Sequence, residues 1–167
     1  MDKLMFLSLI ILCFKYSEAV PAWTFCLCSC ELQRNIFTEN DLVFEEQAIT
    51  EDNKKPDFLF PNAECYHNLH FPSDNLFVLG AKTTCKDRWR QVLTEANRVD
   101  RKYLFTLQQG ISKNQLKEMH DSKLTLVVPR KYITSFPKEY QDEISDLSNF
   151  IRMVGEKQKS FPKFYLF

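Results

Sequence analysis

The feature that most constrains this fold is an apolar run that passes directly into a helix-like stretch at Lys82. Residues 76–79 are short, continuous and apolar, which is typical of a buried strand. Beyond Lys82 the apolar residues recur at helical spacing, and these are Trp89, Val92, Leu93, Ala96 and Val99. Thr84 is suited to cap a helix, with Asp87 in the capping-box position three residues later. The stretch predicts a strand ending near Lys82 and a helix running from Thr84 past Glu95.

The same stretch combines the side chains that a phosphodiester site needs. At about 100° per residue, Glu95 would share its side of the helix with Arg88, and Lys86 would point to the opposite side. A lysine at a strand end, a helical glutamate and nearby cations together suit the chemistry of a phosphate group.

A formal net charge of zero conceals an uneven distribution of charge. Residues 82–102 contain seven basic and three acidic side chains, whereas residues 39–57 are strongly acidic. The basic zone suits a polyanion and the acidic zone suits a cation, although a solvated helix face is the plain alternative for a charge run. Three glycines in the chain exclude a glycine-rich phosphate loop.

The N-terminal part of the chain differs in composition from the rest. Lys3 precedes an apolar run at 4–14, and a small-residue site at 17–19 completes the form of a secretory signal peptide. The run is too short to span a membrane. The Cys-x-Cys-x-Cys pattern at 26–30 lacks zinc-knuckle spacing, so we expect no metal–thiolate site. Cys65 and Cys85 are expected to be reduced.

The remaining pattern predicts one α/β domain with a mixed β-sheet covered by helices. Strands are expected at residues 42–44, 56–61, 76–81, 103–107 and 124–129. Besides the helix after Lys82, helical pattern is found at residues 31–37, 112–120 and 137–154. We expect an irregular connection at residues 62–75 and a loose tail from Lys157.

Metal-dependent phosphodiester hydrolysis needs carboxylates for a hard cation and a positive group that faces the phosphate. Asp57 at a strand start and Lys82 at the end of a neighbouring strand could meet across one ladder. The usual second acid stands two residues before the lysine, where this chain has Gly80. Glu95 can replace it, because a helix leaving the lysine strand can fold back over the sheet. We therefore predict a site of Asp57, Lys82 and Glu95, with the two acids holding a divalent metal ion.

Two motifs resemble the C-terminal catalytic domain of the EcoRII-type restriction endonucleases, which are PD-(D/E)XK nucleases. They are Lys-Pro-Asp-Phe-Leu-Phe-Pro at residues 55–61 and Lys-Thr-Thr-Cys-Lys-Asp-Arg-Trp-Arg-Gln at residues 82–91. The similarity runs from about residue 32 to 151. It implies a restriction-endonuclease-like mixed sheet flanked by helices over residues 31–155. An atypical segment, 1–30, would precede this domain and a basic, aromatic tail, 156–167, would follow it.

The resemblance also implies a role for each matching residue. Asp57 matches the metal-binding aspartate, Lys82 the catalytic lysine and Glu95 the metal-linked glutamate. Tyr66 falls where the family has an active-site tyrosine, and a core tyrosine with a satisfied hydroxyl is the equal alternative at this position.

The resemblance also assigns recognition of the DNA sequence to three residues, Lys86, Asp87 and Arg88. They match the basic-acidic-basic motif with which the wider family recognises CC/GG steps. Lysine or arginine can donate to guanine O6 and N7, and aspartate can accept from cytosine N4. Arg90 and Arg98 would contact phosphates or be solvated.

The implied activity is that of a Mg²⁺-dependent type II restriction endonuclease that cuts double-stranded DNA at a CCWGG-like site. It would act in the cytoplasm as a homodimer that flips the central bases, without a small-molecule cofactor or a membrane. Relative to the family, we expect this chain to have no separate effector domain and to have residues 22–30 in place of the usual polar lead-in. Residues 1–30 are therefore expected to be non-homologous sequence. The alternatives are an inactive remnant that still binds DNA, and a secreted protein if the signal-like segment is genuine.

Overall fold

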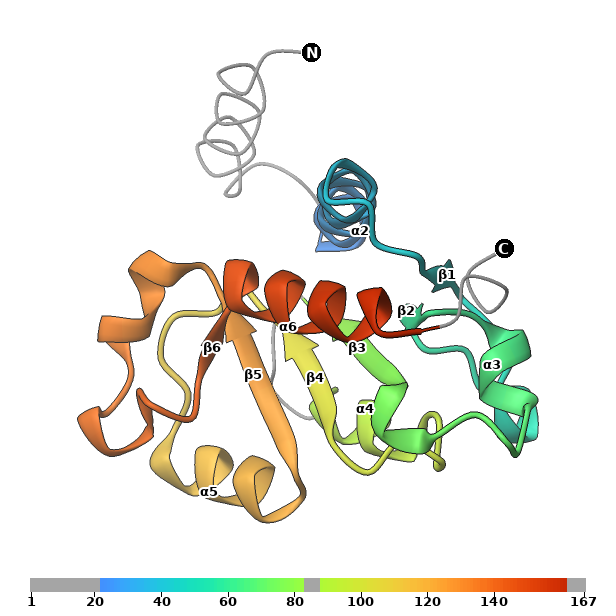
Figure 1. The fold of residues 1–167 in the computed structure, drawn as a ribbon. Coiled ribbons are helices and arrows are strands. Elements are labelled where there is room, and N and C mark those ends of the chain that lie inside the picture. Colours follow the sequence, from blue (N-terminus) through green and yellow to red (C-terminus); the bar gives the residue numbers. More distant parts are fainter. Residues whose placement is uncertain (1–21, 83–87, 162–167) are drawn as a thin grey trace.

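A six-stranded sheet lies between two layers of helices (Figure 1). The computed structural model describes residues 22–82 and 88–161, with residues 22–29 as helical backbone only. The strands are β1 (Glu45–Glu46), β2 (Phe58–Phe60), β3 (Phe77–Ala81), β4 (Lys102–Phe105), β5 (Leu124–Val128) and β6 (Ser145–Asp146). The α-helices are α2 (Ala22–Glu39), α3 (Ala63–His67), α4 (Trp89–Thr94), α5 (Lys113–Asp121) and α6 (Leu147–Lys159). Short 3₁₀ helices are η1 (Glu51–Asn53), η2 (Ser73–Asn75), η3 (Arg130–Ser135) and η4 (Lys138–Tyr140).

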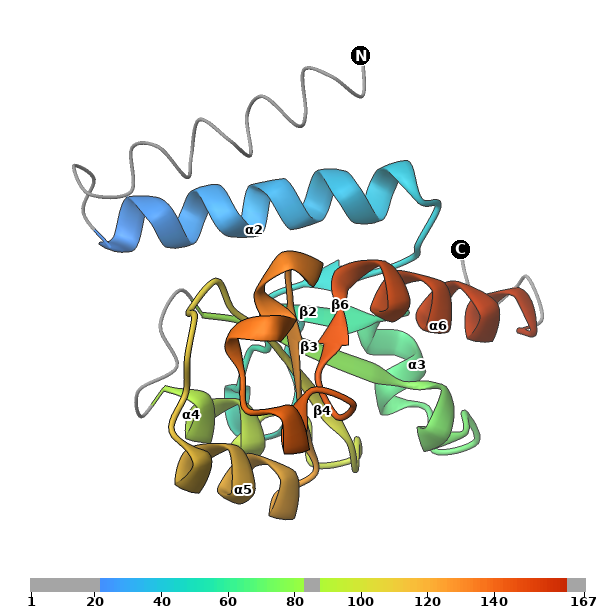
Figure 2. The same ribbon diagram turned by 90° about the vertical axis from the view of Figure 1, so that its left-hand side faces the viewer.

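The sheet is mixed and its strands lie in chain order. β1, β2 and β3 pair antiparallel, whereas β3 to β6 pair parallel. Parallel neighbours need a crossover, which α4 supplies between β3 and β4 and α5 supplies between β4 and β5. Both crossover helices lie on one face, and α2 and α6 cover the other (Figures 1 and 2). The predicted mixed sheet with flanking helices is confirmed.

The core consists of apolar side chains that alternate between the two faces of the central strands. On β4, Leu104 packs with Trp89 of α4 on one face. Tyr103 and Phe105 pack on the other face with Phe37 of α2. Strands covered on both faces read as continuous apolar runs, which is why β3 and β4 were recognisable in the sequence. Each fully buried Leu or Phe side chain stabilises the fold by roughly 1.5–3 kcal/mol.

Two predictions near the ends of the domain are wrong. Residues 42–44 form no strand, because both backbone groups of Val43 are bonded to the Gln158 side chain. The Val43 N–H donates to Gln158 Oε1 at 2.9 Å, and Gln158 Nε2 donates to the Val43 carbonyl at 2.7 Å. Residues 157–161 are also not loose, since α6 extends to Lys159 and Phe161 packs edge-on against Phe71, with ring centroids 5.3 Å apart; the rest of the predicted tail, 162–167, lies outside the described residues.

The irregular connection expected at residues 62–75 contains α3 and η2, and Asn62 caps α3 by accepting from the Cys65 N–H at 2.8 Å. The expected last helix begins at Leu147, ten residues after Pro137, because η4 and β6 occupy the intervening chain. Asp146 pairs with β5 and caps α6 by accepting from the Asn149 N–H at 2.8 Å. The predicted helix at 112–120 is confirmed as α5.

The helix after Lys82 is much shorter than predicted. The predicted cap, Thr84, lies outside the described residues, and α4 ends at Thr94. Glu95 has extended backbone and Ala96 has a φ of +51°, a left-handed conformation that ends helical geometry. The helical-wheel relation among Lys86, Arg88 and Glu95 therefore does not hold, because Glu95 lies beyond the helix.

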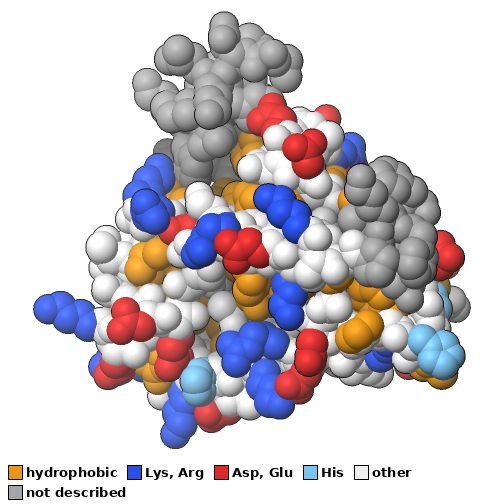
Figure 3. Space-filling view, in the orientation of Figure 1, with side chains coloured by type: hydrophobic (Ala, Val, Ile, Leu, Met, Phe, Trp, Pro, Cys, Tyr) orange, Lys and Arg blue, Asp and Glu red, His pale blue; other side chains and the backbone are white. Residues whose placement is uncertain are grey.

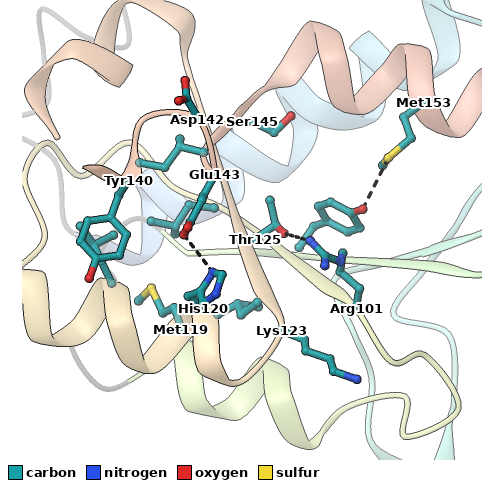
Figure 4. Close-up of a pocket in the computed structure, with 15 residues that line it drawn as sticks. Arg101, Met119, His120, Lys123, Thr125, Tyr140, Asp142, Glu143, Ser145 and Met153 are labelled. Atoms are coloured by element: carbon teal, nitrogen blue, oxygen red, sulfur yellow. Dashed lines mark hydrogen bonds and ion pairs between the residues drawn. The ribbon is translucent and has the colours of Figure 1, made fainter. Parts of the chain in front are cut away.

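Both predicted domain boundaries fall inside helices, residue 30 within α2 and residue 155 within α6. No helix in the described ranges has the length and apolar character needed to cross a membrane. A pocket of about 520 Å³ lies beside the starts of β4 and β5 (Figure 4). It is lined by Arg101 and Thr125, and His120 Nδ1 lies 2.9 Å from Glu143 Oε2 within it. This pocket is at the opposite strand ends from Lys82.

Candidate active site at the carboxyl end of the third strand

Asp57 and Lys82 meet across the β2–β3 ladder, as the sequence predicted. Lys82 Nζ donates to Asp57 Oδ2 at 2.8 Å, and the Ala81 N–H donates to the same oxygen at 2.7 Å. Gln47 Nε2 donates to the other carboxylate oxygen of Asp57 at 3.2 Å. The antiparallel register of β2 and β3 thus fixes an acid and a cation side by side.

The pair lies where a ligand can reach it. The Lys82 N–H donates to the Phe105 carbonyl at 3.0 Å, so Lys82 continues the parallel pairing just beyond β3. Open α/β sheets bind ligands outside the carboxyl ends of their strands. The Lys82 and Asp57 side chains are 14% and 15% exposed, which leaves the ion pair partly screened by protein and still accessible to solvent.

Packing of α4 explains why the usual acid position is a glycine. A Cβ atom on Gly80 would lie 2.6 Å from Cγ2 of Val92. Real Cβ atoms essentially never approach other atoms so closely, so a side chain at Gly80 would require the Val92 side chain or α4 itself to shift. The close approach of α4 to β3 thus disfavours an acid on the strand and also brings the end of α4 toward Lys82.

Glu95 is the carboxylate at that end of α4. It is 3% exposed, and its Oε2 atom has no hydrogen-bond partner among the described residues. Burial raises the pKa of Glu95 to about 7; the positive charge of Lys82 opposes this rise and the negative charge of Asp57 adds to it. Since these charges act on Glu95, the structure brings the three predicted residues together, with the acid on the helix end.

The raised pKa of Glu95 sets the sign of a pH effect on stability. Folded Glu95 still binds a proton between its ordinary value of 4.5 and about 7, whereas the unfolded chain has released it. The free energy of unfolding should therefore fall as the pH rises through this window and level off above it. We expect Glu95→Gln to be more stable than the wild type near pH 8, by about 1–3 kcal/mol, because an unpaired buried charge is removed.

Urea unfolding near pH 5 and pH 8 measures this effect. The exposed Glu156, changed to glutamine, is the matched control and should follow the wild type. Equal pH slopes for the wild type and Glu95→Gln would show that Glu95 does not titrate in this window.

Tyr66 is buried in a hydrogen-bonded network. Its side chain is 2% exposed, its hydroxyl donates to the Glu51 carboxylate, and it accepts from the Arg98 N–H at 3.2 Å. Burial and the Glu51 hydrogen bond raise the pKa of Tyr66, so the hydroxyl keeps its proton near neutral pH. These contacts match the alternative of a satisfied core tyrosine.

Of the predicted DNA contacts, Lys86 and Asp87 lie outside the described residues. Arg88 is exposed just before α4. Arg90 Nη2 donates to Glu118 Oε2 of α5 at 2.7 Å, and its guanidinium lies 4.7 Å from the centre of the Trp89 ring. In the described part of the face seen in Figure 3, basic and acidic side chains are interspersed.

The expectation that Arg98 contacts phosphate or is solvated is wrong. Its guanidinium donates to the backbone carbonyls of Cys65, Tyr66 and Phe71. Arg98 is half-buried, and three of its five N–H donors are used on backbone carbonyls, which holds its side chain against residues 65–71.

Two residues near Glu95 had no motif to reveal them. Lys102 is 7% exposed, and its Nζ donates to the Leu93 carbonyl in the last turn of α4 at 3.0 Å. Burial lowers the pKa of Lys102, and the charge of Glu51 is the largest effect that opposes this. Glu51 lies in a stretch of sequence that reads as a polar loop. Only the three-dimensional arrangement places either residue beside the candidate site.

The donor set can be tested for its fit to a metal ion. In residues 22–82 and 88–161, no three His, Cys, Asp or Glu side chains are grouped as metal ligands. Mg²⁺ commonly uses only one or two carboxylates, with waters and substrate phosphates completing its coordination. Asp57 and Glu95 fit this pattern, and the unpartnered Oε2 of Glu95 is a buried hard donor that a cation would satisfy.

Comparison with known proteins identifies the family. A family model described as EcoRII C terminal matches residues 29–151. The chain is 50% identical over 118 residues to the type II restriction enzyme EcoRII of Escherichia coli, covering 70% of this chain and 29% of that protein. The chain therefore spans less than a third of this curated relative.

Two solved structures share the fold at low identity. Metal-depleted Ecl18kI in complex with uncleaved DNA has a TM-score of 0.65 at 18% identity, over 93% of this chain and 50% of that chain. A PspGI restriction endonuclease–substrate DNA complex has a TM-score of 0.63 at 14% identity, over 78% and 60%. The fold is thus that of the restriction endonucleases. Since the family model covers most of the residues, this chain belongs to the EcoRII C-terminal family.

Proposed function

We propose that this protein is a Mg²⁺-dependent endonuclease that hydrolyses phosphodiester bonds in double-stranded DNA at a CCWGG-like site. The observation that carries the proposal is the Lys82–Asp57 ion pair beside buried Glu95, at the carboxyl end of β3. Family membership and 50% identity to a type II restriction enzyme support the same reaction.

Each residue has a distinct task in this proposal. Asp57 and Glu95 would hold the ion, which when bound supplies a Lewis acid and lowers the pKa of a nearby water. Lys82, held at 2.8 Å from Asp57, places a positive charge beside the scissile phosphate and stabilises the negative charge that develops there. Glu95 must be deprotonated to bind a cation, so at low Mg²⁺ concentration cleavage should rise with pH, and added Mg²⁺ should move this rise to lower pH.

Recognition of DNA would fall to the residues immediately before α4. We assign Lys86, Asp87 and Arg88 to the edges of the C·G pairs, because their side chains offer the donors and the acceptor that these edges require. Ecl18kI and PspGI were each solved in complex with DNA, which supports duplex DNA as the partner. A palindromic site implies a homodimer, in which each subunit reads one half. We also propose that the protein acts in the cytoplasm, where it would encounter incoming DNA.

Cleavage of a defined plasmid tests the proposal. We expect the wild type with Mg²⁺ to cut a plasmid with several CCWGG sites into discrete fragments, and EDTA to stop cutting because the ion is removed. A matched plasmid in which every site carries one changed base is the control and should stay intact. Specific binding without cutting would support an inactive remnant and refute the endonuclease.

A further inference from the structure

The segment that follows Glu95 makes an unusual turn for its composition. Glu95 is extended, with ψ at 142°, and the buried Ala96 adopts a left-handed φ of +51°. The Val99 N–H donates back to the Ala96 carbonyl at 3.0 Å. A non-glycine residue is held in this conformation only where its surroundings fix it. Contacts from distant parts of the chain must therefore hold residues 95–99.

Glu51 and Tyr66 provide these contacts on the side that follows Glu95. Glu51 Oε2 accepts from the Asn97 N–H at 3.2 Å, and the Tyr66 hydroxyl accepts from the Arg98 N–H at 3.2 Å. The Tyr66 hydroxyl also donates to Glu51 Oε1, which links the two acceptors to each other. Two consecutive backbone N–H groups are thus bound by one carboxylate–tyrosine pair.

The Arg98 side chain closes the arrangement from the other direction. It donates to the Tyr66 and Phe71 carbonyls, and its guanidinium carbon lies 5.9 Å from the centre of the Tyr66 ring. α3 and the segment after α4 therefore hold each other through both backbone and side chain. Before Glu95 in the chain, the Leu93 carbonyl in the last turn of α4 accepts from Lys102 Nζ. Glu95 lies between these two attachments.

The bonds of Tyr66 point to its role. Its hydroxyl uses its proton on Glu51 and accepts from Arg98, and its side chain is 2% exposed. We propose that Glu51, Tyr66 and Arg98 form a clamp that positions Glu95 for metal binding, so that Tyr66 is a positioning residue. The role in metal binding rests on the proposed function, whereas the ordering of residues 95–99 by the clamp does not.

Amide hydrogen exchange tests the clamp without any reaction. We expect Tyr66→Phe and Glu51→Ala each to speed exchange at Asn97 and Arg98 by about fivefold to tenfold. Tyr66→Phe removes the hydroxyl that links Glu51 to the Arg98 N–H, and Glu51→Ala removes the carboxylate that accepts from the Asn97 N–H. The double variant should add little, since both changes break the same unit. Tyr103→Phe is the matched control: Tyr103 is 7% exposed and its hydroxyl contacts Met153 in the other core layer. Unchanged exchange in both clamp variants would overturn the clamp, whatever the wild type does to DNA.

The Mg²⁺ dependence of cleavage then separates positioning from chemistry. A displaced Glu95 binds the ion more weakly, so Tyr66→Phe should raise the Mg²⁺ concentration for half-maximal rate by about tenfold. The rate at saturating Mg²⁺ should recover to within about threefold of the wild type, because no reacting group has been removed. Tyr103→Phe should leave both quantities unchanged.

A loss of rate that Mg²⁺ does not restore would decide against the positioning role of Tyr66. A rate that stays about 100-fold low at saturating Mg²⁺, with an unchanged half-maximal concentration, would make Tyr66 a catalytic group and overturn its positioning role. A wild type that cuts no DNA would refute the proposed function and the metal-binding role together, and exchange would still decide whether the clamp orders the segment.

Discussion

Replacement of Lys82 by alanine is expected to lower the rate of DNA cleavage by about 10²–10³-fold while DNA binding stays within about threefold. The ammonium group is the cation that the β2–β3 ladder holds at the site, at 2.8 Å from Asp57. Its charge acts mainly on the transition state, in which negative charge on the phosphate increases. Binding depends on many phosphate and base contacts, so the loss of one charge affects it little.

Single-turnover cleavage and filter binding measure the two quantities separately. Lys123→Ala is the control, because Lys123 pairs with exposed Asp100 and lies at the opposite end of the strands. Thermal unfolding of each variant shows whether the fold is kept. Equal losses of binding and cleavage in Lys82→Ala would assign Lys82 to DNA binding, and full cleavage would remove it from the site.

The second large effect is expected at Gly80, where alanine should destabilise the protein by about 1–3 kcal/mol. Its added Cβ would lie 2.6 Å from Cγ2 of Val92, so the Val92 side chain must leave its rotamer or α4 must shift away from β3. A shift of α4 also moves Glu95, and cleavage should fall together with stability. Urea unfolding gives the first quantity and the Mg²⁺-dependent cleavage rate gives the second.

A double-mutant cycle with Val92→Ala isolates the cause. Val92→Ala removes the methyl groups that the new Cβ would meet, so Gly80→Ala should cost less in that background. Gly155→Ala is the matched control, because the nearest atom to its added Cβ is Leu42 Cδ2 at 3.4 Å. Within α6 this change should be neutral or stabilising by up to about 1 kcal/mol. An equal cost of Gly80→Ala with and without Val92 would exclude the clash as its origin.

The strands that build the site were predictable because their physics is local. Continuous apolar runs marked β3 and β4, and the proline-bounded run after Asp57 marked β2. The meeting of Asp57 with Lys82 followed from antiparallel neighbours, and the empty acid position at Gly80 pointed to Glu95. These inferences needed only strand pairing and side-chain chemistry.

The errors came from contacts between residues far apart in the chain. The helix after Lys82 was predicted too long because its apolar spacing continues to Val99, whereas tertiary bonds end the helix at Thr94. Arg98 reads like any exposed arginine, and only the folded chain surrounds it with three carbonyl groups. Val43 lies in a strand-like sequence pattern, but its backbone bonds the side chain of Gln158 instead of another strand. The local pattern cannot reveal this partner, which is 115 residues away.

The two carboxylates of the candidate site belong to parts of the molecule with different resistance to local opening. Asp57 directly precedes β2 and is bonded to the Ala81 N–H of β3, within a sheet covered on both faces. Glu95 is attached through a six-residue helix and a few hydrogen bonds, which can break while the sheet stays paired. Glu95 can therefore be displaced at a fraction of the free energy of global unfolding. The fraction of time that the two carboxylates lie together can thus change without a change in the stability of the fold, and under the proposed function this fraction would set the rate of cutting.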